Sequence, residues 1–355
     1  MTSEAPVCVI VVNHNGGELL RRCLDALATQ TTLPKEIAVV DNLSTDGSTV
    51  FLETLSEPLA SRVRLISPGL NLGFAAANNL AAGRTSQPWI ATLNPDAFPE
   101  PDWMASLIDA TRRHPGVAMF GSTQLDAGNP LLLDGAGDVL HASGLVWRGH
   151  HGAALAELPA EGEVFSPCAA AALYRRDAFE AAGGFDPSFF CYCEDVDLGF
   201  RLRLAGERCV QVTAARVHHV GSAITGRRGG FATYHGTRNL IWMFVKNMPT
   251  PLLALLTPVH LALNAVLLAR ALVLGQAAPA LRGSWDAIRH IGPVLASRKA
   301  IQARRRLSTI GVARALDWSI AGIIRRRARS LPIPRSLSFP PPLGGSDPIA
   351  SDMPK

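Results

Sequence analysis

Two adjacent carboxylates, Glu194 and Asp195, stand where a helix is expected to begin, directly after the aromatic, turn-rich stretch at residues 187–193. A carboxylate at a helix start is favoured by the exposed backbone N–H groups and by the helix dipole, and that structural explanation accounts for one of the two acids. A carboxylate facing an aromatic loop can also take the proton of an incoming hydroxyl group. The pair is therefore predicted to hold a general base.

Polar residues also cluster where four predicted strands end, and in open parallel sheets ligands bind beyond the carboxyl ends of the strands. One such residue would be an ordinary turn former. Repetition at four strand ends favours a shared ligand cleft over turn chemistry alone. The residues are Asn13 and Asn15 after the first strand, Asp41 and Asn42 after the second, Asn71 after the third, and Asn94 and Asp96 after the fourth.

A cation site is predicted at Asp96, because a carboxylate at a strand end can bind Mg²⁺ or Mn²⁺ together with phosphate oxygens. His219 follows His218 after the predicted strand at residues 209–212, and its imidazole can add a ligand or bond a phosphate. A common turn at residues 94–96 and a structural histidine are the alternatives, and both remain open at this point.

The segment at residues 71–79 combines a glycine turn at Gly73 with small side chains and Asn78, which lets a ligand approach the backbone closely. Tight packing of a helix on the sheet explains the glycine and alanines equally well. The carboxylate of Asp41 can accept hydrogen bonds from a base or ribose, or it can cap the next helix.

The elements that position these groups follow from alternating strand and helix patterns. Short apolar runs rich in β-branched residues predict buried strands, and apolar residues at helical spacing predict helices around residues 20–27 and 103–113. The alternation predicts an α/β fold with a mainly parallel sheet flanked by helices. The Gly-rich stretch at residues 121–165 is predicted to be a long loop or small subdomain. The predicted strands are residues 7–12, 36–40, 63–66, 89–93 and 117–120.

Composition narrows the functional classes. The chain of 355 residues suits one large or two ordinary domains, and 48% hydrophobic residues can fill a substantial core. The sequence lacks both the GxGxxG dinucleotide fingerprint and a Walker lysine loop. The six cysteines form no CxxC pattern, so free thiols in a reducing cytosol are favoured over a structural zinc site at Cys191, Cys193 and the tandem histidines.

Together these motifs resemble the family-2 glycosyltransferases with the GT-A fold, in particular their rhamnosyltransferase-like branch. The resemblance covers about residues 6–245 and lies in the order and spacing of the motifs. The motifs are VVNHN at 11–15, DNLSTDGS at 41–48, NLGFAAANN at 71–79, NPD at 94–96, GGFD at 183–186, EDVDL at 194–198 and HHVGS at 218–222.

The resemblance implies an inverting transfer with Asp195 as the catalytic base and Asp96 as the metal-binding acid of the DxD element. It implies that Asp41 reads the nucleobase of a dTDP- or UDP-sugar, dTDP-L-rhamnose being typical of this branch, and that His219 helps to hold Mg²⁺ or Mn²⁺ or the diphosphate. Asn94 replaces the first acid of the DxD element. The predicted nucleotide-sugar-binding residues are Asn13, Asn15, Asp41, Asn42, Asn71, Gly73, Asn78 and Asn94.

The expected domain is a GT-A glycosyltransferase domain at residues 1–245, with a nucleotide-sugar-binding half at 1–120 and an acceptor and catalytic half at 121–245. Residues 246–330 are predicted to form an apolar and then basic helical extension, and residues 331–355 a disordered tail. The apolar stretch at 251–274 is long enough to span a bilayer, but its polar interruptions favour an interfacial or re-entrant helix over a span or a buried oligomer helix.

Basic residues are concentrated between Leu281 and Arg335, where only Asp286 and Asp317 oppose them. With few aromatic residues nearby and an apolar segment upstream, anionic phospholipid suits this segment better than nucleic acid. The sequence thus predicts a cytoplasmic enzyme, peripheral to the inner face of the cell membrane, that acts on a glycan or polyprenyl-linked acceptor. A nucleotidyltransferase and a non-catalytic sugar-nucleotide-binding membrane scaffold are the lower-ranked alternatives.

Overall fold

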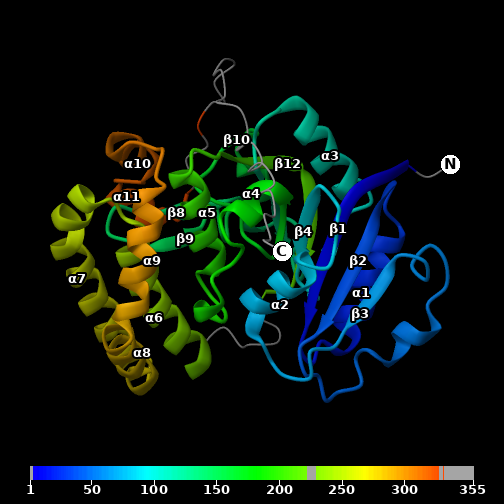
Figure 1. Cartoon of the computed structure of the whole chain (residues 1–355), viewed down its shortest axis with the longest axis horizontal. Coiled ribbons are helices and arrows are strands. Elements are labelled where there is room, and N and C mark those ends of the chain that lie inside the picture. The colour runs from blue at the N-terminus through cyan, green and yellow to red at the C-terminus, as the bar shows by residue number, and fades with distance from the viewer. Residues whose placement is uncertain (1–2, 222–228, 328–330, 332–355) are drawn as a thin grey trace, which may run out of the picture.

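The computed structural model describes residues 3–221, 229–327 and 331 of the chain. Strands and helices alternate in the first half of the sequence, and helices follow one another in the last third (Figure 1). The strands are β1 (Ser3–Asn13), β2 (Thr32–Asp41), β3 (Val63–Ile66), β4 (Trp89–Leu93), β5 (Ala97–Pro99), β6 (Met119–Asp126), β7 (Leu133–Gly135), β8 (Asp138–Leu140), β9 (Val146–Arg148), β10 (Gly162–Glu163), β11 (Ala171–Arg175) and β12 (Cys209–His219). The α-helices are α1 (Gly17–Ala28), α2 (Gly73–Ala82), α3 (Trp103–Arg113), α4 (Arg176–Ala181), α5 (Glu194–Leu204), α6 (Gly230–Asn247), α7 (Thr250–Val273), α8 (Ala277–Arg289), α9 (Ile291–Ala303), α10 (Thr309–Ala315) and α11 (Ile320–Arg325).

One large sheet organises the first two thirds of the chain. Among the described residues it has 10 strands, in the order β10-β12-β6-β11-β4-β1-β2-β3, with β5 paired to β12 and β7 to β6. Strands β4, β1, β2 and β3 are parallel, and β11 runs antiparallel between β4 and β6. The predicted α/β fold with a mainly parallel sheet is therefore confirmed.

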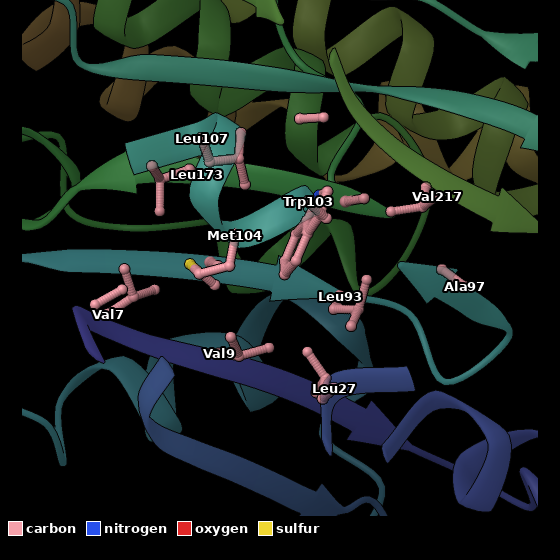
Figure 2. Packing of buried hydrophobic residues seen from close by; sticks show 14 of the residues in the cluster. Val7, Val9, Leu27, Leu93, Ala97, Trp103, Met104, Leu107, Leu173 and Val217 are labelled. Atoms are coloured by element: carbon pink, nitrogen blue, oxygen red, sulfur yellow. The ribbon is translucent and has the colours of Figure 1, made fainter. Parts of the chain in front are cut away.

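Strand β1 shows why its sequence is a continuous apolar run. Successive side chains of a strand point to opposite faces of the sheet. Val7 and Val9 pack against α1 and α3, where Figure 2 shows them near Leu27 and Met104. Cys8 and Ile10 lie in a second cluster with residues of α2, α4 and α5. Because helices cover both faces, every position of the strand interior favours an apolar residue.

The stretch at residues 121–165 contains more strand than predicted. Strand β6 continues to Asp126 beside β12, and β8 and β9 form a separate two-stranded sheet. Strands of three residues give too few alternations to be recognised from a sequence pattern, so the prediction of a loop or small subdomain missed them. This stretch carries Asp134, Asp138 and Arg148.

The C-terminal helices form a layer beside α5 and share a hydrophobic cluster with it, which includes Phe200 and Leu204 of α5. Helices α8 and α9 both pack on α6, and α6 runs past the predicted domain boundary at residue 245 to Asn247. Among the described residues, α7 is the one helix long and apolar enough to cross a membrane by length and composition. The predicted disordered tail, apart from Leu331, lies outside the described residues.

Candidate active site

A cavity of about 530 Å³ opens beyond the carboxyl ends of β1, β2 and β4. Its walls bring together segments far apart in the sequence, from the strand ends to α5 and β12. Eight of the predicted site residues line it: Asn42, Asn71, Gly73, Asn94, Asp96, Glu194, Asp195 and His219. Asn13, Asn15, Asp41 and Asn78 are absent from this lining, although each is a described residue.

One end of the cavity holds a carboxylate next to an imidazole. The Nε2 atom of His219 lies 3.3 Å from the Oδ1 atom of Asp96, and both side chains are buried. They meet because β12 pairs with β5, which places His219 opposite Ala97. Asn94 completes the group, with its Nδ2 atom 3.5 Å from Nε2 of His219. These carboxylate, imidazole and amide groups suit a divalent cation that takes further ligands from phosphate oxygens.

The orientation of His219 is fixed from behind by Asp134. The Nδ1 atom of His219 lies 2.7 Å from Oδ2 of Asp134, which also pairs with Arg148 and with His151. Burial alone would lower the pKa of His219, but its hydrogen bonds with Asp134 and Asp96 outweigh burial and raise that pKa. A carboxylate behind a histidine in this way is common where the other ring nitrogen binds a metal. Sequence reasoning did not single out Asp134, Arg148 or His151.

The same cavity is lined by the two acids at the start of α5, a helix start that confirms the predicted position. The carboxylate of Asp195 accepts hydrogen bonds from the backbone N–H groups of Ala169 at 3.1 Å and Val196 at 2.8 Å. Burial raises the pKa of Asp195, although these two hydrogen bonds and the charge of Arg148 oppose the rise. Burial, together with the charge of Asp195, raises the pKa of Glu194 well above its usual value.

The loop before α5 adopts an uncommon backbone conformation. Phe190, Tyr192 and Cys193 have φ values of 65°, 70° and 63°, in the region that residues other than glycine seldom adopt. The side-chain amide of Asn239 on α6 donates to the carbonyl oxygens of Phe189, Cys191 and Tyr192, at 2.9, 2.9 and 2.8 Å. A residue of the C-terminal helices therefore holds this loop in place, and no motif in the sequence pointed to it.

The aromatic residues of this loop divide between the cavity and the core. Phe190 and Tyr192 line the cavity. Phe189 does not share that position, because its ring packs against Trp242 in the C-terminal core and is 1% exposed. Phe190 covers Gly73, and a Cβ atom on Gly73 would come within 2.5 Å of the Phe190 ring. Gly73 thus allows close packing of this loop on α2.

Charged residues beneath α5 form a buried network. Asp197 pairs with Arg201 one turn later in α5 at 2.9 Å, and both side chains are buried. The ammonium group of Lys246 bridges Asp197 at 2.8 Å and Asp186 at 2.6 Å, and Asn247 donates to Asp197 at 2.7 Å. Lys246 and Asn247 belong to the end of α6, so this helix also holds the first turn of α5 in place.

The polar residues after β1 and β2 hold a neighbouring loop. Asn13 donates to the hydroxyl groups of Ser44 and Ser48, and the side-chain oxygen of Asn15 accepts from the backbone of Thr45. Asp41 accepts from the backbone N–H of Ser44 at 3.0 Å. Asn78 donates to a carbonyl one turn earlier in α2. Asn42 and Asn71 are hydrogen-bonded to each other at 2.8 Å at the cavity edge.

A curated relative of known activity settles the family. N-acetylglucosaminyl-diphospho-decaprenol L-rhamnosyltransferase from Mycobacterium tuberculosis is 32% identical over 258 residues, which cover 64% of this chain and 79% of the relative. The family model for glycosyl transferase family 2 matches residues 8–183. The chain belongs to glycosyl transferase family 2. This glycosyltransferase is thus similar to a rhamnosyltransferase, as the motifs predicted.

Solved structures support the fold. A mannosyltransferase from Pyrobaculum calidifontis, in complex with GDP-Man and Mn²⁺, aligns with a TM-score of 0.53 at 20% identity and covers 88% of this chain and 87% of its own. S. aureus TarS 1–349, in complex with UDP-GlcNAc, aligns with a TM-score of 0.53 at 13% identity and covers 88% of this chain and 93% of its own. At these identities the likeness concerns the fold, which confirms the predicted GT-A architecture.

Proposed function

We propose that this glycosyltransferase moves a sugar, with inversion, from a nucleoside-diphosphate donor to a hydroxyl group of a glycan or polyprenyl-linked acceptor. The observation that carries the proposal is that Asp195 and the Asp96–His219 pair line the same cavity. L-rhamnose from dTDP-rhamnose is the favoured donor, since a 32% identical relative is a rhamnosyltransferase with a decaprenol-linked substrate in its name. A UDP-sugar is the alternative donor.

In the proposed step, the acceptor oxygen bonds to the anomeric carbon while the bond from that carbon to the diphosphate oxygen breaks. The hydroxyl proton passes to the Asp195 carboxylate, and the nucleoside diphosphate leaves with the electron pair of the broken bond. Hydrogen bonds from Ala169 and Val196 fix the orientation of this carboxylate. The raised pKa of Asp195 makes it a stronger base than an exposed aspartate.

The Asp96–His219 pair, which lines the same cavity, fits a divalent cation. Asp96 and Nε2 of His219 would hold Mg²⁺ or Mn²⁺, with Asn94 beside them, and Asp134 keeps the imidazole turned toward the site. When bound, the ion offsets the negative charge that develops on the diphosphate leaving group. The Mn²⁺ found with GDP-Man in the Pyrobaculum mannosyltransferase supports this assignment.

The decisive test of the base is Asp195→Asn in a nucleotide-release assay with a panel of sugar nucleotides and lipid-linked acceptors. Loss of a general base lowers turnover about 10²–10⁴-fold. The matched control is Asp109→Asn, which changes an exposed aspartate paired with Arg113 on α3. Near-normal turnover of Asp195→Asn would remove it as the base. Binding of a nucleotide sugar without turnover for any acceptor would favour the scaffold alternative.

We further propose that the enzyme rests on an anionic membrane surface through α7 and α8. In the most apolar stretch of α7, with a mean hydropathy of 2.1, only 17% of the residues are buried. Its polar interruption His260 faces the protein, where it stacks on Phe244 at 3.9 Å and bonds to the Ser143 carbonyl. Apolar side chains therefore dominate the outward face, and basic residues lie beside them. The exposed residues of this face are Leu255, Val259, Leu261, Val266, Leu272, Leu281, Trp285 and Ile288.

Vesicle co-sedimentation tests this membrane proposal. The double change Leu261→Asp and Val266→Asp is expected to lower binding to vesicles that contain phosphatidylglycerol, because both side chains are more than 60% exposed on α7. Leu131→Asp is the control, since Leu131 is 72% exposed on a loop of the glycosyltransferase domain. Equal binding by wild type and the double variant would contradict the proposed surface.

A further inference from the structure

A second group of potential metal ligands surrounds the proposed base. One carboxylate oxygen each of Asp138 and Asp195 and the Sγ atom of Cys168 all lie within 4.8 Å of one another. Asp138 is on β8, Asp195 begins α5 and Cys168 lies in the loop before β11, so three separate segments converge here. All three residues also line the cavity. The trio shares no residue with the Asp96–His219 pair.

The Asp138 side chain indicates that the trio has room for a ligand. Asp138 is 4% exposed, yet no described residue forms a hydrogen bond with its carboxylate, which faces Cys168 and Asp195. A buried carboxyl group normally has a hydrogen-bond partner or a counter-charge. The guanidinium of Arg148 acts on all three groups, but it is also paired with Asp134. Burial raises the pKa of Asp138, and its carboxyl group lies in the interior beside Cys168 and Asp195 without a hydrogen-bond partner among the described residues.

We propose that Cys168, Asp138 and Asp195 form a second cation site that selects Zn²⁺ and that its occupation inhibits the enzyme. A thiolate with two carboxylates is a donor set for Zn²⁺, which takes three protein ligands and leaves a fourth position open. Thiolate ligands favour Zn²⁺ over Mg²⁺ or Mn²⁺, and the Asp96–His219 pair contains no thiolate, so the two sites are expected to select different ions. Burial raises the pKa of the Cys168 thiol to about 12, and coordination to zinc would deprotonate it.

The inhibitory part of this inference rests on the proposed function of Asp195. A carboxylate bound to Zn²⁺ has its lone pairs engaged by the ion and cannot take the proton of the acceptor hydroxyl. Zinc would therefore stop transfer without displacing the activating ion. The binding part depends only on the positions of the three ligand atoms, so the two parts can be tested separately.

The binding test uses Co²⁺ in place of Zn²⁺ on the full-length protein saturated with Mg²⁺. A cobalt–thiolate bond gives a charge-transfer absorption in the near ultraviolet, which the wild type is expected to show and Cys168→Ala to lack. Cys191→Ala is the matched control, because Cys191 is another free thiol lining the same cavity but is outside the trio. Thermal unfolding of each variant checks that it is folded.

The activity test titrates ZnCl₂ at saturating Mg²⁺, with each variant normalised to its own turnover without zinc. Cys168→Ala is expected to raise the half-inhibitory zinc concentration at least about 10-fold, the low end of what loss of even an outer partner costs a metal site. The proposal is overturned if the wild type shows no thiolate absorption, or if Cys168→Ala keeps the absorption and the zinc sensitivity. Absorption without inhibition would support the zinc site but reject its inhibitory role. It would also count against Asp195 as the catalytic base.

Discussion

The side-chain amide of Asn239 lies 2.8 Å from the carbonyl oxygen of Tyr192, and the same amide donates to the carbonyls of Phe189 and Cys191. One buried residue of α6 thus satisfies three backbone carbonyls of a loop whose residues have positive φ values. Such a conformation persists only where its surroundings enforce it. The loop ends at Glu194 and Asp195, so its shape sets the position of the proposed base.

Replacing Asn239 with alanine is expected to loosen this loop. The carbonyls of Cys191 and Tyr192 lose this donor, while the Phe189 carbonyl keeps the Cys191 N–H and Arg238, and the free energy of unfolding should fall by about 1–3 kcal/mol. A misplaced Asp195 should lower turnover about 10–100-fold. Nucleotide release and urea unfolding measure the two effects. Asn264→Ala is the control, because the Asn264 amide bonds only to a carbonyl one turn earlier in α7. Normal turnover of Asn239→Ala would show that the loop holds its shape unaided.

Gly73→Ala is expected to disturb the same loop from the opposite side. Gly73 has a φ of 73°, and a new Cβ atom would also meet the ring of Phe190 at 2.5 Å. Gly69→Ala separates the two effects, since Gly69 has a φ of 77° with nothing within 4 Å of its Cβ position. Both variants should lose about 1 kcal/mol of stability from backbone strain. Only Gly73→Ala should also lower turnover. Equal turnover in the two variants would show that the contact between Phe190 and Gly73 does not position the loop.

Asp134→Asn is expected to weaken metal binding at the Asp96–His219 pair. The change removes the carboxylate that orients His219, and loss of such a partner typically costs 10–100-fold in affinity. The Mn²⁺ concentration that gives half-maximal nucleotide release should rise by about that factor. An exposed-carboxylate variant, Asp109→Asn, should leave it unchanged. If both variants need the same Mn²⁺ concentration, His219 does not hold the ion.

Lys246→Met is expected to destabilise the fold strongly. Lys246 is 1% exposed and pairs with both Asp186 and Asp197, so its loss removes the ammonium partner of Asp186 and one of the two cationic partners of Asp197, at a cost of about 3–5 kcal/mol. Arg176→Met breaks the exposed pair with Glu180 and should cost less than about 1 kcal/mol. Denaturant unfolding compares the two, and similar losses would argue that the buried network contributes little.

The stability of the fold should fall in acid partly through Asp186. Burial alone would raise the pKa of Asp186, but the Lys246 ammonium outweighs it and lowers the pKa to about 2. A lowered carboxyl pKa contributes stability that is fully present above the unfolded value of about 4 and is lost as the pH falls through about 2. Unfolding measured across this range should show a shallower decline in Lys246→Met than in wild type. Parallel curves would contradict the assignment.

Two predicted site residues that the structure brings together, Asp96 and His219, are adjacent to strongly patterned strands. Asp96 follows β4 and His219 ends β12, and both lie in the cavity because the register of β5 and β12 brings them together. Asp134 was missed because it is 85 residues from His219 and lies on a three-residue strand. A contact between such distant segments depends on the packing of the whole domain and leaves no local pattern.

The polar residues at the end of β1 show a second limit of prediction from the sequence. Asn13 and Asn15 bond to the loop that contains Ser44 and Thr45, and turn formation and ligand binding favour the same residue types at strand ends. The residue type therefore could not separate these roles. Phe189 belongs to the aromatic stretch before Glu194, but the turn at Phe190 directs its ring toward Trp242 and away from the cavity. The direction of a side chain in an irregular loop is set by backbone angles that the sequence does not reveal.

Helix α6 has a practical consequence for anyone who wishes to study the sugar-transfer region alone. A protein shortened at residue 245, where motif similarity ends, would keep Asn239 but lose Lys246 and Asn247 and the helices that pack on α6. Asp186 would then lose its ammonium partner, and Asp197 would keep only Arg201 of its two cationic partners. Such a fragment should be insoluble or inactive for reasons unrelated to membranes, and a soluble version is better sought by polar substitutions on the outer face of α7.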